Sequence, residues 1–186
     1  KNLTIPLIGV HNIKNAASAL SVAFSIGVSD KIIKKGLKNF KGVQRRFNFL
    51  FEKNQIPFFD DYAHHPTEIE SVLDGVKKVY GEEEIVCIFQ PHRISRVRNL
   101  KKEFSKCFKK ADTILLCPIY KAGENIKLGF SYESFAKLIA KNSNVNLIML
   151  KNEHELKKII KNKTFGKKFF IAMGAGSISN WVRNLN

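Results

Sequence analysis

The 186-residue sequence predicts an α/β protein built on a doubly wound, mainly parallel sheet. Two observations lead to this fold class. From about residue 45 onward, short apolar runs alternate with segments of roughly 10 to 15 residues whose apolar side chains recur with helical spacing. The polar and glycine-containing motifs follow directly after the apolar runs, and ligands of such sheets bind beyond the carboxyl ends of the strands. We therefore expect the functional residues at one edge of the sheet.

The residues before this alternating part predict one strand and two helices. An apolar run at residues 3–9 is expected to form the strand. Gly27 is expected to end the first helix, Ser29 to cap the second and Gly42 to stop it. The apolar or small positions with helical spacing are Ala16, Ala17, Leu20, Ala23 and Phe24 in the first helix, and Ile32, Ile33, Leu37 and Phe40 in the second.

The rest of the chain predicts a hairpin followed by alternating helices and strands. No internal repeat, low-complexity segment or long linker interrupts this order. The expected elements are a hairpin of residues 47–52 and 56–60, a helix from Pro66, a strand at 85–89, a helix through Val97, Leu100, Phe104 and Phe108, a strand at 113–117, a helix through Phe135, Leu138 and Ile139, a strand at 145–150, a helix capped by Asn152, a strand at 169–173 and a final helix through Ile178, Trp181 and Val182.

The composition is that of an ordinary globular protein, with 44% hydrophobic and 26% charged residues. No apolar run approaches the roughly 20 residues that span a bilayer, and no signal peptide is recognisable. The cysteines Cys87, Cys107 and Cys117 are odd in number and lie within apolar runs, which favours a reduced, cytoplasmic chain. Because the first residue is Lys1 rather than Met, we expect the C-terminal part of a longer protein.

The net charge of +16 makes nucleic acid a partner to consider, because Lys and Arg neutralise phosphates. Of the 32 basic residues, 26 are lysines spread over nearly every predicted helix, which is typical of a solvated surface. The arginines instead gather in two clusters, and a guanidinium can bind phosphate or carboxylate through two parallel hydrogen bonds. These clusters are Arg45 with Arg46, and Arg93 with Arg96 and Arg98.

Two motifs near the start of the chain suggest nucleotide binding. In HNIKN, Asn12 and Asn15 are three residues apart and share one face of a helix, where carboxamides can read an adenine edge. Helix capping by Asn12 is the alternative. In GVQRRF, an arginine at the junction of the two parts of the chain could hold a phosphate across a domain boundary. An exposed arginine pair without a role is the alternative there.

Two further motifs each follow a predicted strand. DDYAHHPTE, residues 60–68, combines acids, an aromatic ring and two imidazoles; a metal site or side-chain bonds to the local backbone are the alternatives. In FQPHRISR, residues 89–96, Arg93 and Arg96 can converge on a carboxylate or phosphate, unless the loop is only solvated surface. YKAGE and MGAGSI are weaker signals. The sequence contains neither the P-loop motif nor the glycine fingerprint of NAD-binding domains.

Taken together, GVHNIKNAA, GVQRRF, DDYAHHPTE, FQPHRISR, YKAGE and MGAGSI resemble the C-terminal portion of the Mur ligases over essentially the whole chain. DDYAHHPTE with FQPHR is most similar to the branch that adds L-alanine to UDP-N-acetylmuramate. A recycling branch that joins a tripeptide to the same sugar nucleotide shares DDxAHHP but has an acidic EPRSNT-like string in place of FQPHR. That branch remains an alternative, as does a basic, noncatalytic module that binds nucleic acid.

The resemblance implies that residues 1–44 end a central ATP-binding domain and that residues 45–186 form a Rossmann-like C-terminal domain. It implies an ATP-dependent, ADP-forming ligase of peptidoglycan biosynthesis, which forms an amide through an acyl phosphate. ATP and Mg²⁺ would be required, with the metal ligands outside this chain. UDP-N-acetylmuramate and L-alanine would be the substrates, without nucleic acid or membrane insertion, and this part alone would be inactive.

The resemblance also assigns roles to individual residues. Ser177 departs from the family pattern, in which an Asp is commoner at this position, so an acidic role there is in doubt. The assignments are Asn12 and Asn15 to the adenine, Arg46 to the ATP phosphates, Asp61 and His64 to the nucleotide side, Arg46 and His64 to catalysis, and Tyr62, His92, Arg93 and Arg96 to the amino acid.

Overall fold

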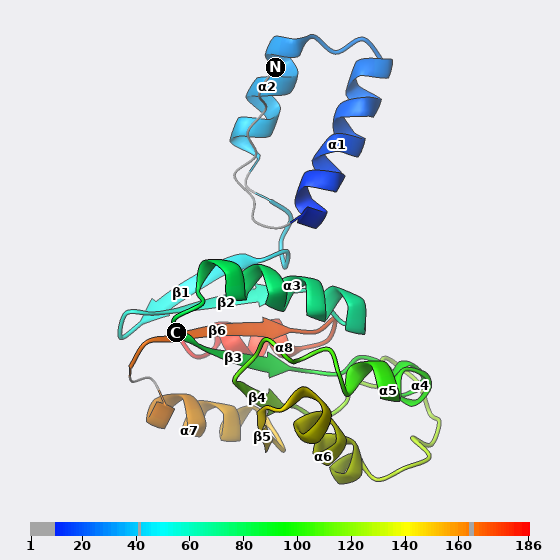
Figure 1. The fold of residues 1–186 in the computed structure, drawn as a ribbon, viewed down its shortest axis with the longest axis vertical. Coiled ribbons are helices and arrows are strands. Elements are labelled where there is room, and N and C mark those ends of the chain that lie inside the picture. Colours follow the sequence, from blue (N-terminus) through cyan, green and yellow to red (C-terminus); the bar gives the residue numbers. More distant parts are fainter. Residues whose placement is uncertain (1–9, 41, 164–165) are drawn as a thin grey trace. The chain divides into compact units, whose positions relative to one another are not determined.

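The computed structural model describes residues 10–40, 42–163 and 166–186 (Figure 1). The chain divides into two compact units, residues 1–44 and residues 45–186. Among the residues described, no helix is both long and apolar enough to cross a membrane.

The first unit contains two helices, α1 (Val10–Ser25) and α2 (Asp30–Asn39). Gly27 ends α1 as expected: it adopts a φ of 77°, and the N–H of Val28 after it donates to the carbonyl of Ala23. Ser29 occupies the predicted N-cap of α2, although its side chain makes no capping hydrogen bond. The strand expected at residues 3–9 lies outside the described residues.

The second unit follows the predicted alternation of strands and helices. Asn152 caps a helix as expected, because its Oδ1 accepts the Glu155 N–H at 3.1 Å. The elements are β1 (Asn48–Lys53), β2 (Ile56–Asp61), α3 (Pro66–Val79), β3 (Glu84–Phe89), α4 (Ile94–Asn99), α5 (Lys101–Phe104), β4 (Thr113–Leu116), α6 (Tyr132–Ser143), β5 (Asn146–Met149), α7 (Glu153–Lys163), β6 (Lys168–Met173) and α8 (Ile178–Arg183).

The strands form one sheet in the order β1-β2-β6-β3-β4-β5. β1 and β2 pair as an antiparallel hairpin and the remaining neighbours are parallel, which confirms the predicted, mainly parallel sheet. The pairing places Asp61, Met173, Phe89 and Leu116 side by side in one row across the sheet. The loops that follow β2, β6, β3 and β4 therefore leave the sheet at the same edge.

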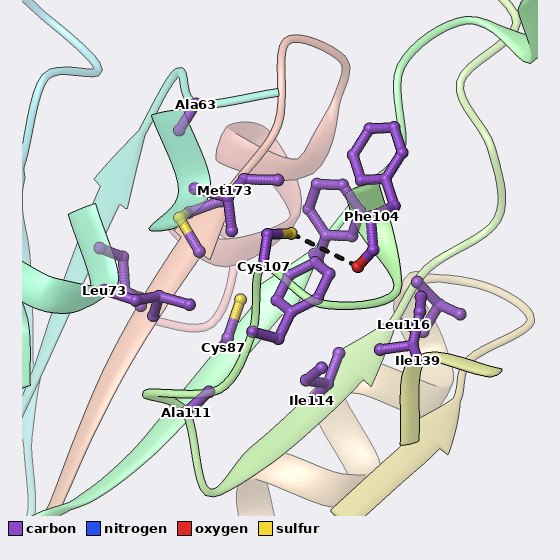
Figure 2. Close-up of a cluster of buried hydrophobic side chains, with 14 of the residues drawn as sticks. Ala63, Leu73, Cys87, Phe104, Cys107, Ala111, Ile114, Leu116, Ile139 and Met173 are labelled. Atoms are coloured by element: carbon purple, nitrogen blue, oxygen red, sulfur yellow. Dashed lines mark hydrogen bonds between the residues drawn. The ribbon is translucent and has the colours of Figure 1, made fainter. Parts of the chain in front are cut away.

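Apolar side chains cover both faces of the sheet, as a parallel sheet requires. Successive residues of a strand point to opposite faces, so Cys87 packs with α3 while Ile88 packs on the side of α7 and α8. Figure 2 shows part of the first cluster, where the Cys107 Sγ donates to the Phe104 carbonyl at 3.4 Å. Burial raises the pKa of the Cys117 thiol to about 12. The three cysteines are free and buried, as expected for small apolar side chains.

One predicted helix differs from the structure. The segment expected to form a continuous helix through Val97 and Phe108 is divided into α4, α5 and turns, because Leu100 leaves the helical conformation at φ −111° and ψ 27°. Val97, Phe104 and Phe108 are nevertheless fully buried. The apolar spacing therefore identified the core positions but not the break.

Candidate functional site

The loop after β2 is held in place by the carboxylate of Asp61. Its Oδ1 accepts the Ala63 N–H at 2.7 Å, and its Oδ2 accepts the Phe47 N–H at 2.8 Å. The side chain is almost fully buried, with 2% of the residue exposed. Asp61 therefore ties the loop to the beginning of the second unit. This is a structural role for a residue that the resemblance assigned, with His64, to the nucleotide side.

The start of α3 is fixed by a capping box. The His65 Nδ1 accepts the Thr67 N–H, and the Glu68 Oε2 accepts the N–H groups of His64 at 3.0 Å and His65 at 3.3 Å. Burial opposes ionisation of Glu68, but these hydrogen bonds, together with electrostatic interactions with His64 and Arg46, outweigh it and lower its pKa. The Glu68 carboxylate thus stays charged beside the loop.

The arrangement of the DDYAHHPTE motif does not favour a metal site. His65 is engaged at the helix start, and the Asp60 carboxylate binds Arg183 and Ser179, whereas Asp61 binds the loop backbone. No group of three or more metal-ligating side chains is found in the part of the chain that the structure describes. The local-backbone alternative accounts for Asp61 and His65, and also for the Nδ1 of His64, which contacts the Tyr62 carbonyl.

The geometry of His64 fixes which ring nitrogen carries a proton. Its Nδ1 lies 2.9 Å from the Tyr62 carbonyl oxygen, which can only accept a hydrogen bond. Nδ1 is therefore protonated, and it also lies 3.5 Å from the Glu68 Oε2. In the neutral ring the lone pair is then on Nε2, where it can accept a proton.

The loop after β3 places His92 in the opposite tautomer. The Arg96 Nη1 lies 3.2 Å from the His92 Nδ1 and donates to the His92 carbonyl at 3.0 Å. Because a guanidinium can only donate, Nδ1 accepts and the proton is on Nε2. Burial and the charge of Arg96, followed by the charges of His64 and Arg93, lower the pKa of His92, while Glu124 opposes them. His92 thus offers a neutral N–H donor.

Four rings from three loops form a continuous row, Tyr62, His64, His92 and Tyr120. The His64 ring lies edge-on to Tyr62 at 5.2 Å and to His92 at 5.7 Å between centroids. The Tyr120 ring stacks on His92 at 5.7 Å. Tyr62 is 37% exposed and Tyr120 is 42% exposed, so both ends of the row face solvent. The row joins the ends of β2, β3 and β4.

Glu124 completes the site and was not assigned a role from the sequence. Its carboxylate accepts the Ser95 N–H at 2.9 Å and the Ser95 hydroxyl, and it lies 4.0 Å from the Arg93 Nη1. The hydrogen bonds from the Ser95 side chain and backbone lower the pKa of Glu124. Arg93 itself has a φ of 72° and is exposed. Glu124 thus holds the start of α4 and one of the predicted arginines.

The turn after β6 is closely packed against the loop after β3. The buried Gln90 donates through Nε2 to the Ser177 Oγ at 3.2 Å and accepts the Ile178 N–H through Oε1 at 3.0 Å. A Cβ on Gly176 would lie 2.6 Å from the Tyr120 Cγ and would also clash with the Gln90 Oε1. Gly176 therefore permits the close approach of these loops, and Ser177 helps to fix Gln90.

The two arginines of GVQRRF have different surroundings. Arg46 is exposed, whereas Arg45 is partly buried and donates to the carbonyls of Gly174 and Gly176, the latter at 3.3 Å. The Arg45 guanidinium also lies over the Tyr62 ring, with Cζ 4.7 Å from the centroid. The resemblance assigned a role to Arg46 alone, whereas the motif by itself does not distinguish the two adjacent arginines.

The two asparagines lie in the first unit. Asn12 is 8% exposed, and Asn15, one helical turn later on α1, is exposed. Their contact with adenine stays a prediction. In the second unit, the structure brings Tyr62, His64, His92 and Arg96 into contact, with Arg93 close by.

The site offers hydrogen-bond donors that can bind an anion. It also offers one proton acceptor. The Arg93 and Arg96 guanidinium groups and the His92 Nε2–H can bind a carboxylate, and a neutral His64 offers a lone pair within the same ring row. A small molecule with both a carboxylate and an amine matches this set. Arg46, which is exposed near the β2 loop, is available to a more extended anion.

Comparison with known proteins agrees with this arrangement. The model of the Mur ligase, glutamate ligase domain matches residues 45–176. The chain is 61% identical over 190 residues to UDP-N-acetylmuramate–L-alanine ligase of Pelagibacter ubique, covering 100% of this chain and 41% of the relative. The enzyme of the same name from Agrobacterium fabrum is 39% identical, over 100% of this chain and 39% of its own.

Solved structures give the same result. UDP-N-acetylmuramate-alanine ligase of Thermotoga maritima superimposes with a TM-score of 0.78 at 29% identity, covering 98% of this chain and 38% of that one. The murein peptide ligase of Psychrobacter arcticus has a TM-score of 0.68 at 25% identity, again over 98% and 38%. The chain spans about two fifths of the length of these relatives. The chain therefore belongs to the Mur ligase family, and its residues 45–176 match the glutamate ligase domain of that family.

Proposed function

We propose that the protein containing this chain is an ATP-dependent, ADP-forming ligase that joins L-alanine to UDP-N-acetylmuramate. The muramoyl carboxylate would attack the γ-phosphate of ATP and release ADP. The amine of L-alanine would then attack the acyl phosphate, forming the amide and releasing inorganic phosphate. The reaction would take place in the cytoplasm, as a step of peptidoglycan biosynthesis. The observation that carries the proposal is the contact of His92, which binds Arg96, with the Tyr62–His64 pair, in a chain 61% identical to the Pelagibacter ubique ligase.

We propose that residues 1–44 end the ATP-binding domain and that residues 45–186 form the C-terminal domain. The division of the chain into two compact units after Gln44 supports this boundary. Asn12 and Asn15 would then contact the adenine from the ATP-binding domain, since their carboxamides can donate and accept together. Arg46, two residues past the boundary, would neutralise charge on the transferring phosphoryl group.

We propose that Mg²⁺ accompanies the ATP phosphates and is bound by residues outside this chain. Among the described residues, no group of three or more His, Cys, Asp or Glu side chains is arranged to hold a metal ion. No task of the residues below depends on the metal.

The amino acid would be held by the loop after β3. Arg93 and Arg96 would bind its carboxylate, and the His92 Nε2–H would add a donor that remains available at neutral pH because the pKa of His92 is lowered. Tyr62 would border the amino acid from the loop after β2. His64 would take a proton from the ammonium group of L-alanine and so leave the neutral amine that attacks the acyl phosphate, because the His64 Nδ1–H is held by the Tyr62 carbonyl and Nε2 carries the lone pair.

The proposal is tested by giving the full-length protein UDP-N-acetylmuramate and ATP with either L-alanine or the recycling tripeptide. We expect a product whose mass corresponds to one added alanine, formed together with ADP. A product with the tripeptide and none with alanine would assign the protein to the recycling branch instead. If neither product forms and the protein binds RNA tightly at physiological salt, the nucleic-acid alternative replaces the ligase.

A further inference from the structure

We propose that Arg45 is a positioning residue of the amino-acid site, which acts by fixing the Tyr62 ring against the turn after β6. The inference rests on the proposed function, because it concerns the site at which L-alanine would bind. Neither the resemblance nor the comparisons assign a role to this residue. Two contacts of Arg45 and the backbone conformation around it carry the argument.

The first contact is with the turn after β6. The Arg45 Nη2 donates to the carbonyls of both Gly174 and Gly176. Carbonyl groups beyond the end of a strand have no partner in the sheet and need a hydrogen-bond donor from elsewhere. The Arg45 Nη2 supplies this donor to both carbonyls. The Nε of Arg45 remains buried without a hydrogen-bond partner among the described residues. An unpaired buried donor costs free energy, so the other contacts of Arg45 have to offset this cost.

The second contact is with Tyr62, through both its backbone and its ring. The Arg45 carbonyl accepts the Tyr62 N–H at 2.6 Å, and the Arg45 guanidinium covers one face of the Tyr62 ring at 4.7 Å. A guanidinium held over an aromatic face attracts the ring. The Tyr62 ring is thus fixed between Arg45 and His64, which lies edge-on to it.

The third feature is the backbone around the arginine. Arg45 has a φ of 59° and Phe47 a φ of 51°, and both are residues that seldom adopt this region. Phe47 is held by its N–H bond to Asp61 and by ring contacts with Phe59 and Phe169. Such a conformation persists only when surrounding contacts determine it. Residues 45–47 are therefore clamped onto the ends of β2 and β6, and Arg46 is exposed between two fixed neighbours.

The test uses the full-length enzyme with Arg45→Met, which keeps the length of the side chain but removes its charge and its donors. We expect the KM for L-alanine to rise about 5- to 20-fold, as the loss of a partly buried cation–π contact and its hydrogen bonds suggests. The KM for ATP should change less than 2-fold, roughly the scatter of such comparisons. The KM of Arg45→Lys for L-alanine should lie between those of wild type and Arg45→Met, because lysine retains the charge but cannot stack as a planar group on the ring.

The matched control is Arg183→Met. Arg183 also binds buried acceptors, the Asp60 Oδ2 at 3.3 Å and the Ser179 Oγ at 3.3 Å, but it lies on α8, away from the ring row. Its loss should lower the melting temperature while leaving the KM for L-alanine unchanged. An increase in KM that merely follows a loss of stability would therefore appear in both variants, and that result would overturn the inference.

A double-mutant cycle tests whether Arg45 acts through Tyr62. If it does, Arg45→Met should add little to the KM effect of Tyr62→Leu, because the interaction is already lost. Full additivity would show that Arg45 does not work through the ring and would overturn the proposal. If Arg45→Met does not fold, Arg45→Lys decides the question, because its KM for L-alanine and its KM for ATP are compared with wild type in the same way. If the wild-type enzyme makes no alanine product, the proposed function fails. If the wild-type enzyme makes the product and Arg45→Met leaves the KM for L-alanine unchanged, only this inference fails.

Discussion

Arg93 and Arg96 already have partners within the chain, so their exchange for lysine is a sharp test of the amino-acid site. In the full-length enzyme, Arg93→Lys and Arg96→Lys should raise the KM for L-alanine and leave that for ATP nearly unchanged. A lysine keeps the charge but loses the fork that fixes a carboxylate plane. The loss of one charge-assisted hydrogen bond corresponds to about 10- to 150-fold in kcat/KM.

Arg98 provides the control for these variants, because it lies exposed on the same helix, α4. Arg98→Lys should leave both KM values unchanged. If the two test variants instead weaken ATP binding and spare alanine, Arg93 and Arg96 belong to the nucleotide site.

Arg46 should affect the rate more than binding. Because the charge that it would neutralise develops as the phosphoryl group transfers, Arg46→Ala should lower kcat on the order of 100-fold or more in the full-length enzyme, with a smaller effect on ATP binding. Steady-state kinetics with ATP varied at saturating alanine measure both quantities. An unaltered kcat would remove Arg46 from the catalytic residues.

The titration of His92 should report its contact with Arg96. Burial and the Arg96 charge lower the pKa of His92 from its ordinary value of 6.5. Arg96→Leu should therefore raise this pKa, as measured by NMR titration of the ring protons, whereas Arg98→Leu should not. Since the unfolded chain takes up the His92 proton first as the pH falls, the contribution of His92 to the unfolding free energy should be lost below about pH 6.5. A His92 pKa that is unchanged by Arg96→Leu contradicts the contact.

At the scale of single residues, the sequence identified the residues of the site better than it identified the residues that they contact. The resemblance named Tyr62, His64, His92 and Arg96, and the structure brings all four together. Glu124 escaped notice because its partner Ser95 lies 29 positions away and only the packing of two loops brings them together. Such long-range pairs leave no local pattern in one sequence.

Among the elements, the turn between β6 and α8 is the most restrictive. Gly176→Ala would place a methyl group against the Tyr120 ring and the Gln90 side chain, and should lower the free energy of unfolding by about 1 to 3 kcal/mol. Gly75→Ala is the control, because no atom lies within 4 Å of the added Cβ within α3. It should stabilise the chain by about 0.5 to 1 kcal/mol, since glycine is unfavourable inside a helix. Chemical denaturation measures both, and an equal effect of the two changes would contradict the packing.

The elements also show how far periodicity can be trusted. Phe135 and Ile139 were expected on the helix between the strands at 113–117 and 145–150, and both are fully buried in α6. The same spacing between residues 97 and 108 predicted an unbroken helix, yet the chain bends at Leu100. In the second unit, apolar spacing therefore indicates which side chains are buried even where a short turn interrupts the helix. In the first unit, Phe24 and Ile32 have the same spacing but are exposed.

For the molecule as a whole, we expect residues 1–186 alone to hydrolyse no ATP. The sequence lacks the P-loop motif that cradles the β- and γ-phosphates, so ATP should also bind weakly. A phosphate-release assay on the purified chain, compared with a control without protein, tests this expectation. Release well above that control would contradict the assignment of the phosphate-binding motif to another part of the protein.

The place of β6 in the sheet has a consequence for how the protein is made. β6 lies between β2 and β3 but is synthesised after both. On the ribosome, the nascent chain can form the β1–β2 hairpin and the β3–β4 pair, but no strand yet pairs with both β2 and β3. Tyr62 and His64 then belong to one half, and His92 and Arg96 to the other. The ring row therefore forms only when β6 inserts, and a polypeptide released before that point would hold two unjoined halves whose exposed strand edges favour aggregation.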